Sequence, residues 1–157
     1  MKAQTVYSFL ESVDELFGSM FAATVQRGEP VYSSAMSDGS EVVALIGISG
    51  DIQGSVALAM PIETALRLTS ALLGMPNESF DATTTDAVAE LVNIVGGGAK
   101  AKLTTLNQQP LHLGLPSVLF GQAIAVTVPS SAVWMNIPFE SELGPFSLCM
   151  ALQDAMS

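Results

Sequence analysis

The chain has 157 residues, the size of one ordinary domain that folds without a disulfide or a metal. Hydrophobic residues make up 49% of it and charged residues 13%, a balance that excludes a disordered chain. Fifteen acidic residues against five basic ones give a formal net charge of −10, which would repel a phosphate backbone, so nucleic acid is excluded as the expected ligand.

The cysteine, the histidine and the apolar runs limit which metal sites and which cellular locations we expect. Cys149 is the single cysteine and His112 the single histidine, too few for a disulfide or a zinc site, so we expect both to be packing residues. The N-terminus lacks the long apolar core of a signal peptide, and the apolar run Val42 to Ile48 is too short to span a bilayer. We expect a soluble, cytoplasmic protein with no metal of its own and no membrane contact.

The first part of the chain predicts a helix and then a β-hairpin. Between Thr5 and Val25 the apolar residues recur at three- and four-residue steps, as one buried helix face requires: Val6, Phe9, Leu10, Val13, Leu16, Phe17, Met20 and Phe21. Val42 to Ile48 and Ile52 to Met60 predict two strands joined by a short turn. Gly54 marks a bulge or a point of close approach in the second strand.

Two further helices follow. Ile62 to Leu73 is the second, and Gly74 ends it. The threonines at 83–85 and Asp86 offer capping oxygens to a third helix that runs to about Leu106.

Beyond Pro110 the pattern becomes that of strands, which we expect at Leu111 to Phe120, Ala123 to Val128, Val133 to Phe139 and Phe146 to Gln153. Helices combined with an extensive, mostly antiparallel sheet predict an α/β layered sandwich. We expect residues 1–157 to form a single domain.

A faint internal repeat relates the first and third predicted helices. In this alignment four residues of the first, Ser8, Ser12, Glu15 and Gly18, fall opposite Asp86, Glu90, Asn93 and Gly96. The two halves of the chain are therefore candidates for a pseudo-twofold relationship.

The third predicted helix has two distinct faces. Its apolar residues cluster on one side: Val88, Leu91, Val92, Val95, Ala99, Leu103 and Leu106. Asp86, Glu90, Asn93 and Gly97 form a second stripe that must look outward. A carboxylate and an amide are thus displayed one turn apart on a rigid element. Taken alone, such a stripe is usually only solvated surface.

A longer pattern changes this interpretation. Asp86 is followed after three residues by Glu90, after two more by Asn93, and after twenty-two more by Pro116. By chance this spacing occurs in well under about one in a hundred chains of this length. It resembles the signature of the CheC, CheX and FliY family of chemotaxis phosphatases, in which Asp or Ser opens the motif.

The resemblance extends over most of the chain and implies a CheC-like, pseudo-twofold fold. It implies hydrolysis of the phospho-aspartate of a CheY-like receiver domain. In this family the motif can occur on both pseudo-symmetric helices, but here Ser12 and Glu15 stand where Glu and Asn would be, so one site remains. A single central site is similar to CheX, which is dimeric, and we therefore expect a homodimer. Val133 to Phe139, with Trp134, is the stretch expected nearest the dimer contact.

The resemblance also implies roles for the motif residues. Asn93 would orient the attacking water, because an amide donates and accepts hydrogen bonds at once. Glu90 would pair with the active-site lysine of the receiver, and the Mg²⁺ of the reaction would be the receiver's own ion. Asp86, Gly97 and Pro116 would support the site or touch the partner. For Asp86 a favourable position near the helix dipole, and for Pro116 a strand edge, are simpler explanations.

Gly96, Gly97 and Gly98 stand together inside the third helix, where each costs on the order of 1 kcal/mol relative to alanine. One interpretation is that Gly97 admits a partner's backbone while its neighbours allow tight packing within the protein. The other is that the helix ends or kinks there.

Two other functions compete with the phosphatase. The chain could be a non-catalytic receiver-binding or flagellar-switch-like module, against which an intact Glu90 and Asn93 argue. It could also bind a small molecule in a pocket beneath the sheet, although no convergent polar set other than the motif is visible.

Overall fold

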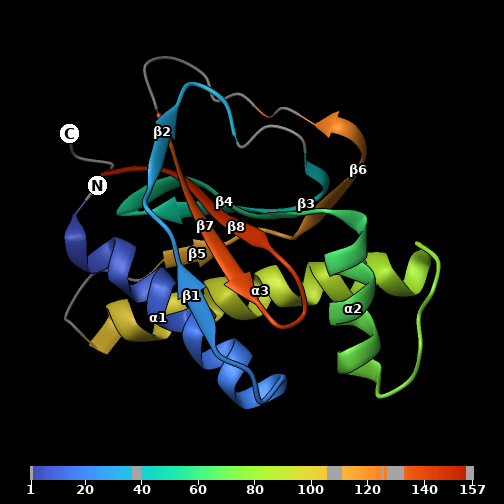
Figure 1. The fold of residues 1–157 in the computed structure, drawn as a ribbon. Coiled ribbons are helices and arrows are strands. Elements are labelled where there is room, and N and C mark those ends of the chain that lie inside the picture. Colours follow the sequence, from blue (N-terminus) through green and yellow to red (C-terminus); the bar gives the residue numbers. More distant parts are fainter. Residues whose placement is uncertain (1, 37–39, 106–110, 125, 127–132, 155–157) are drawn as a thin grey trace.

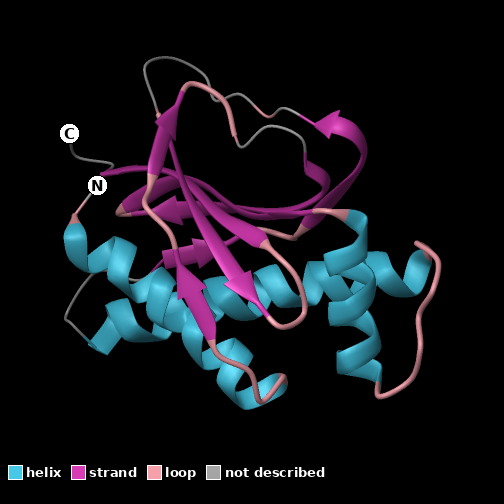
Figure 2. Ribbon diagram, viewed as in Figure 1, coloured by secondary structure: helices cyan, strands magenta, loops and turns pink. Residues whose placement is uncertain are grey.

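Three helices cover one face of an eight-stranded antiparallel sheet (Figures 1 and 2). The computed structural model describes residues 2–36, 40–105, 111–124, 126 and 133–154. The helices are α1 (Ala3–Met20), α2 (Ile62–Leu73) and α3 (Ala82–Thr105). The strands are β1 (Val25–Arg27), β2 (Val31–Ser33), β3 (Ser40–Gly50), β4 (Ile52–Met60), β5 (Leu111–Leu113), β6 (Ser117–Ile124), β7 (Trp134–Ser141) and β8 (Phe146–Asp154). The predicted α/β layered sandwich is confirmed.

The main core lies between the sheet and the helices. Alternate residues of the central strands point into it, as the two-residue period of a strand requires, and β8 contributes Phe146, Leu148, Met150 and Leu152. The opposite residues of the same strands form a smaller cluster on the outer face of the sheet, made of Met36, Val43, Ala57, Ala59, Trp134, Cys149 and Ala151. Burying both faces explains why the central strands contain almost no charge.

Helix α1 is shorter at its C-terminal end than the sequence indicates. The prediction extended it to Val25, but the helix ends at Met20, and Val25 begins β1. Ala22 has a φ of 50°, a left-handed conformation that stops the helix. The apolar periodicity continued through Phe21 because that ring still packs on Phe17 from outside the helix.

The predicted hairpin and the second helix are confirmed. β3 and β4 pair antiparallel, and α2 ends at Gly74 in the left-handed conformation. Gly54 is a close-approach point and not a bulge, because its pairing register with β3 and β8 is unbroken. A Cβ at this position would overlap the carbonyl oxygen of Ala151.

The predicted strand Leu111 to Phe120 is two strands. β5 pairs with one end of β3 and β6 with the other, and the connection Gly114–Pro116 separates them. The Gly114 N–H donates a hydrogen bond to the Gly47 carbonyl at 2.9 Å, whereas Pro116 has no N–H to give. The predicted strand Ala123 to Val128 begins inside β6, and most of the remainder lies outside the described residues.

The stretch Val133 to Phe139, which we expect nearest a dimer contact, does not lie at an edge of the sheet. β7 pairs with β8 on one side and with β1 and β2 on the other. Trp134 is completely buried in the outer cluster. β1 and β2 could not be predicted from the sequence because each is only three residues long, which is too short to show alternation.

Candidate functional site: the exposed stripe of helix α3

Helix α3 starts at a cap that the sequence analysis placed too late. Asp81 Oδ1 accepts a hydrogen bond from the Thr84 N–H at 3.1 Å, and Thr84 Oγ1 accepts one from the Asp81 N–H at 3.2 Å. The Thr84 N–H is the main cause that lowers the pKa of Asp81, and the Asn77 amide adds to it. This reciprocal arrangement is a capping box. Asp81 and Thr84 therefore cap the helix, the role that was expected of residues 83–86. Asp86 lies beyond the first turn, which removes its helix-dipole explanation.

Three sides of α3 are enclosed. The predicted apolar residues face the core, and Leu106 alone of that set lies outside the described residues. A second side packs on α1, where the buried Ser12 hydroxyl donates to the Val95 carbonyl at 2.8 Å. A third side meets β5, where both methyl carbons of Leu113 would lie 3.4 Å from a Cβ on Gly96. The helix is continuous from Ala82 to Thr105 and does not end at its three glycines.

Each glycine has its own surroundings. A Cβ on Gly98 would overlap the Ser12 Oγ, and one on Gly96 would press on Leu113. Gly97 has nothing within 4 Å of such a Cβ, so it faces open space. Gly96 and Gly98 thus allow close packing within the protein, as one of the two interpretations required. The packing of this chain therefore does not require a glycine at position 97.

The fourth side of α3 displays the motif. Asp86 and Glu90 are exposed, and Asn93 and Gly97 are half-buried. Within the part of the chain that the structure describes, the side chains of Asp86, Glu90 and Asn93 form no hydrogen bond and no ion pair. The carboxylate and the amide are therefore available to groups outside this chain, on a helix that cannot easily move.

Pro116 is carried to the same region by the sheet. It closes the connection between β5 and β6, and both strands contact α3. Its half-buried ring immediately precedes the edge strand β6, so the structural explanation of this proline also fits. The structure thus brings four motif residues, Asp86, Glu90, Asn93 and Gly97, onto one stripe and places Pro116 on the flank where Gly96 meets β5.

Helix α1 carries no equivalent stripe. Ser8 and Ser12 are buried. Glu15 is exposed and pairs with Lys102 of α3, and this ion pair raises the pKa of Lys102. Ser12 and Glu15, two of the residues aligned with the motif, therefore join α1 to α3, whereas the Ser8 hydroxyl donates to the Gln4 carbonyl within α1.

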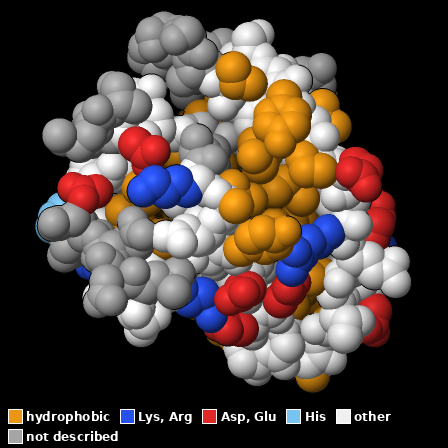
Figure 3. Space-filling view, turned by 90° about the vertical axis from the view of Figure 1, so that its left-hand side faces the viewer, with side chains coloured by type: hydrophobic (Ala, Val, Ile, Leu, Met, Phe, Trp, Pro, Cys, Tyr) orange, Lys and Arg blue, Asp and Glu red, His pale blue; other side chains and the backbone are white. Residues whose placement is uncertain are grey.

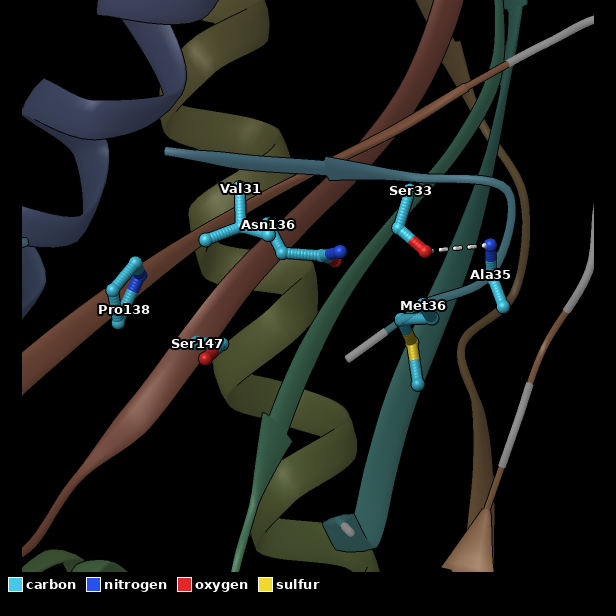
Figure 4. A pocket seen from close by; sticks show the side chains of 7 residues that line it. All are labelled: Val31, Ser33, Ala35, Met36, Asn136, Pro138 and Ser147. Carbon is cyan, nitrogen blue, oxygen red and sulfur yellow. Dashed lines mark hydrogen bonds between the residues drawn. The ribbon is translucent and has the colours of Figure 1, made fainter. Parts of the chain in front are cut away.

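A pocket of about 210 Å³ lies on the outer face of the sheet, away from α3 (Figure 4). Its lining is uncharged and consists of Val31, Ser33, Ala35, Met36, Asn136, Pro138 and Ser147. Asn136 Oδ1 is buried and has no hydrogen-bond partner among the described residues. One buried amide and two serines in so small a space are not the convergent polar set that a small-molecule site needs.

The single cysteine and the single histidine of the sequence lie in different surroundings. Cys149 is buried in the outer cluster, as expected of a packing residue, whereas His112 is exposed on β5, so its assignment as packing was wrong. The described residues contain no group of three or more histidine, cysteine or acidic side chains close enough to hold a metal ion. None of the described helices is both long and apolar enough to cross a membrane.

Known proteins share this fold closely. A CheC-like superfamily protein from Shewanella sp. PV-4 superposes with a TM-score of 0.88 at 26% identity, over 98% of this chain and 99% of that one. A complex of CheX with CheY, BeF₃ and Mg²⁺ from Borrelia burgdorferi gives a TM-score of 0.74 at 21% identity, over 96% and 98%. The fold and the stripe define a CheC-like protein.

The sequence comparisons narrow this class. The CheY-P phosphatase CheX of Thermotoga maritima is 29% identical over 139 residues, which are 88% of each chain. The family model described as chemotaxis phosphatase CheX matches residues 42–140, which include the whole of α3 and Pro116. The chain belongs to the CheX family.

The surroundings of the glycines predict opposite effects of two neighbouring substitutions. Gly97→Ala should raise the melting temperature by a few degrees, because alanine favours the helix by about 1 kcal/mol and the added methyl group meets nothing. Gly98→Ala should lower the melting temperature, because the methyl group displaces the Ser12 hydroxyl from Val95. Thermal unfolding followed by circular dichroism measures both. Equal effects of the two variants would contradict the packing described here.

Proposed function

We propose that this chain hydrolyses the phospho-aspartate of a CheY-like receiver domain, and that Asn93 and Glu90 act on it. The observation that carries the proposal is the display of an unpartnered carboxylate and an unpartnered amide, one turn apart, on the open side of an otherwise enclosed helix. Two relatives support it, since one is a CheY-P phosphatase and the other is a CheX bound to CheY. In this proposal the protein is a single domain, and it acts in the cytoplasm together with its receiver partner.

Asn93 is suited to placing a water molecule. Hydrolysis of an aspartyl phosphate needs a water held in line behind the phosphorus atom and compensation of the charge on the phosphoryl oxygens. The Asn93 amide can accept a hydrogen bond from the water and donate one to a neighbouring oxygen without ionising. It is half-buried on a helix fixed on three sides, so little order is lost when the partner arrives.

Glu90 is assigned to docking. It is exposed and is bound to no cation of the described chain, so its charge is free for a cation of the partner. The active-site lysine of the receiver is that cation in the proposal. A charge-assisted hydrogen bond between them would fix how the two proteins align and would hold the lysine near the phosphoryl oxygens. Asp86 and Gly97 extend the same stripe, and Pro116 adjoins it, as supporting or partner-binding residues.

The magnesium ion in this proposal belongs to the receiver. The Borrelia complex contains Mg²⁺ together with CheY and BeF₃, which supports that assignment. The role of this chain is to bring a water and a carboxylate to a phosphoryl group that the receiver and its ion already hold.

The competing proposal is an adaptor that binds the receiver without hydrolysis. It uses the same stripe and the same fold. Asn93 distinguishes the two functions. An adaptor that only docks would not need an amide side chain that is free of partners within the described residues.

Asn93→Ala should reduce dephosphorylation by at least tenfold while receiver binding stays nearly unchanged, because the change removes the placement of water and not the docking charge. The decay of a phosphorylated receiver from the same genome measures turnover, and titration with the BeF₃-loaded receiver measures binding. Glu90→Gln is the matched comparison, since it keeps the shape of the side chain and removes the charge. It should weaken binding as well as turnover. An Asn93→Ala variant with more than about a tenth of the original activity would contradict the role of Asn93.

Removal of Mg²⁺ should stop dephosphorylation only through the receiver. Titration calorimetry of the isolated chain with MgCl₂ should show no saturable binding, because exposed Asp86 and Glu90 alone make a poor site for a hard cation. A one-to-one Mg²⁺ site that is lost in Glu90→Gln would overturn this assignment of the ion.

We also propose that the protein is a homodimer that associates through the edge formed by β1 and β2. This edge lies at the opposite end of the sheet order from β5, so such a dimer leaves the α3 stripe open. Val31 and Tyr32 of β2 are 57% and 63% exposed. Figure 3 shows hydrophobic side chains gathered in one area of the side of the molecule that it views, above a group of acidic and basic ones. Unpaired edges with exposed apolar residues favour association.

Light scattering at micromolar concentration should give twice the mass of one chain. Tyr32→Glu should shift this mass to that of a monomer, because it places a charge at the contact. Leu73→Glu on α2, at a side chain that is also substantially exposed, is the control and should leave the dimer intact. A monomeric wild-type protein, or equal effects of both variants, would contradict the proposed contact.

A further inference from the structure

A long part of the sequence has no carboxylate. The chain contains fifteen aspartates and glutamates, yet none lies between Leu91 and Phe139. The charged residues of this stretch at neutral pH are Lys100 and Lys102, whereas the rest of the chain has three basic residues. The described part of the stretch forms the C-terminal part of α3, the strands β5 and β6, and most of β7.

The carboxylate-free strands lie along one flank of the α3 stripe. Gly96 meets Leu113 of β5, and Gly98 meets Ser12 of α1. At 100° per residue, Gly97 is equally far from both, so the stripe separates a β5–β6 flank from an α1 flank. We call the residues 111–124 the β5–β6 edge. They form the edge of the sheet next to β3.

The β5–β6 edge exposes large apolar side chains in fixed positions. Leu115 is 91% exposed, more than any other large hydrophobic residue described. It stands between Gly114, whose N–H is bound to Gly47, and Pro116, whose ring fixes the backbone. Phe120 is 55% exposed and stacks on Phe80 at 4.1 Å between ring centroids. A single exposed leucine is ordinary, but two such side chains held beside a functional stripe suit a protein contact.

The α1 flank has the opposite character. Glu11 and Glu15 both contact Lys102, and Asp14 pairs with Arg27 at 2.7 Å. The carboxylates there hold Lys102 and Arg27, whereas Lys2 at the start of α1 forms no ion pair within the described residues. Lys100, three residues after Gly97, forms no ion pair within the described residues. Lys100 therefore offers a positive charge without an ion-pair partner beside the α3 stripe.

We infer that the β5–β6 edge and Lys100 form the surface on which the phosphorylated receiver docks, with Leu115 as its apolar contact. This inference rests on the proposed function and adds the direction of approach. A phosphoryl group is an anion, and an unpaired lysine attracts it over a Debye length of about 8 Å. Docking over the β5–β6 flank brings the phosphoryl group towards Lys100, buries Leu115 in the interface and leaves α1 uncovered. Apolar contacts near the centre of an interface commonly contribute most of its affinity.

The test is a kinetic comparison of Leu115→Ser with Tyr7→Ser, using the full chain and a phosphorylated receiver from the same genome. Tyr7 is 57% exposed on the α1 flank, which makes it a matched control. Leu115→Ser should raise KM at least about fivefold and leave kcat within about twofold, because Leu115 touches the partner and not the phosphoryl group. Tyr7→Ser should change neither. Lys100→Gln should also raise KM, and its effect should shrink as salt is added.

If no hydrolysis occurs, titration with the receiver loaded with BeF₃ and Mg²⁺ still tests the docking surface. A wild-type protein that binds the receiver but does not hydrolyse it would overturn the proposed function, while a loss of affinity in Leu115→Ser alone would still uphold the docking surface. Unchanged KM and affinity in Leu115→Ser would overturn the docking surface and leave the function standing. Weaker binding in Tyr7→Ser than in Leu115→Ser would place the receiver on α1 instead. A change of the mass of the free protein in Leu115→Ser would mean that the edge joins two copies of this chain, which would also overturn the docking surface.

Discussion

The close contact of α3 with α1 determines how the rest of the structure is used. Gly98 lets the Ser12 hydroxyl reach the Val95 carbonyl, and this contact holds the two helices together over the sheet. Because the core, α1 and β5 occupy three sides of α3, one side is left for a partner, and the motif residues stand there. Glycines that weaken an isolated helix are tolerated because neighbouring elements hold this one in place. Ser12 shows the same constraint from the other side, since a glutamate there could not fit against α3.

Charge complements this geometry. The protein is strongly acidic, yet its net charge is unevenly placed, and the carboxylates near α1 are largely engaged with Lys102 and Arg27. Glu90, like Asp86, is a carboxylate on the stripe with no cation of its own among the described residues. In the proposed function, a phosphoryl group and a lysine of the same receiver are received at adjacent points of this one helix.

The sequence predicts the long elements well because their patterns are strong. The hairpin of β3 and β4, helix α2 and the alternation in β8 follow directly from periodicity and from Gly74. The stripe Asp86, Glu90 and Asn93 could be placed from helical spacing alone. Short and nonlocal features could not be predicted. β1 and β2 are paired by β7 and not by any pattern of their own, and the break at Gly114–Pro116 depends on a hydrogen bond to Gly47. The Asp81 and Thr84 cap was readable as an Asp-x-x-Thr spacing, but the adjacent threonines obscured it.

The central claim is that the chain is a catalyst for its partner and not only a binder. The most direct measurement is the decay of a phosphorylated receiver from the same genome, followed with this protein at a small fraction of the receiver concentration. Catalysis predicts that every receiver molecule loses its phosphoryl group faster than it does alone, with many turnovers per protein molecule and phosphate released in equal amount. A decay rate that stays at its spontaneous value, while the receiver is demonstrably bound, would contradict the central claim.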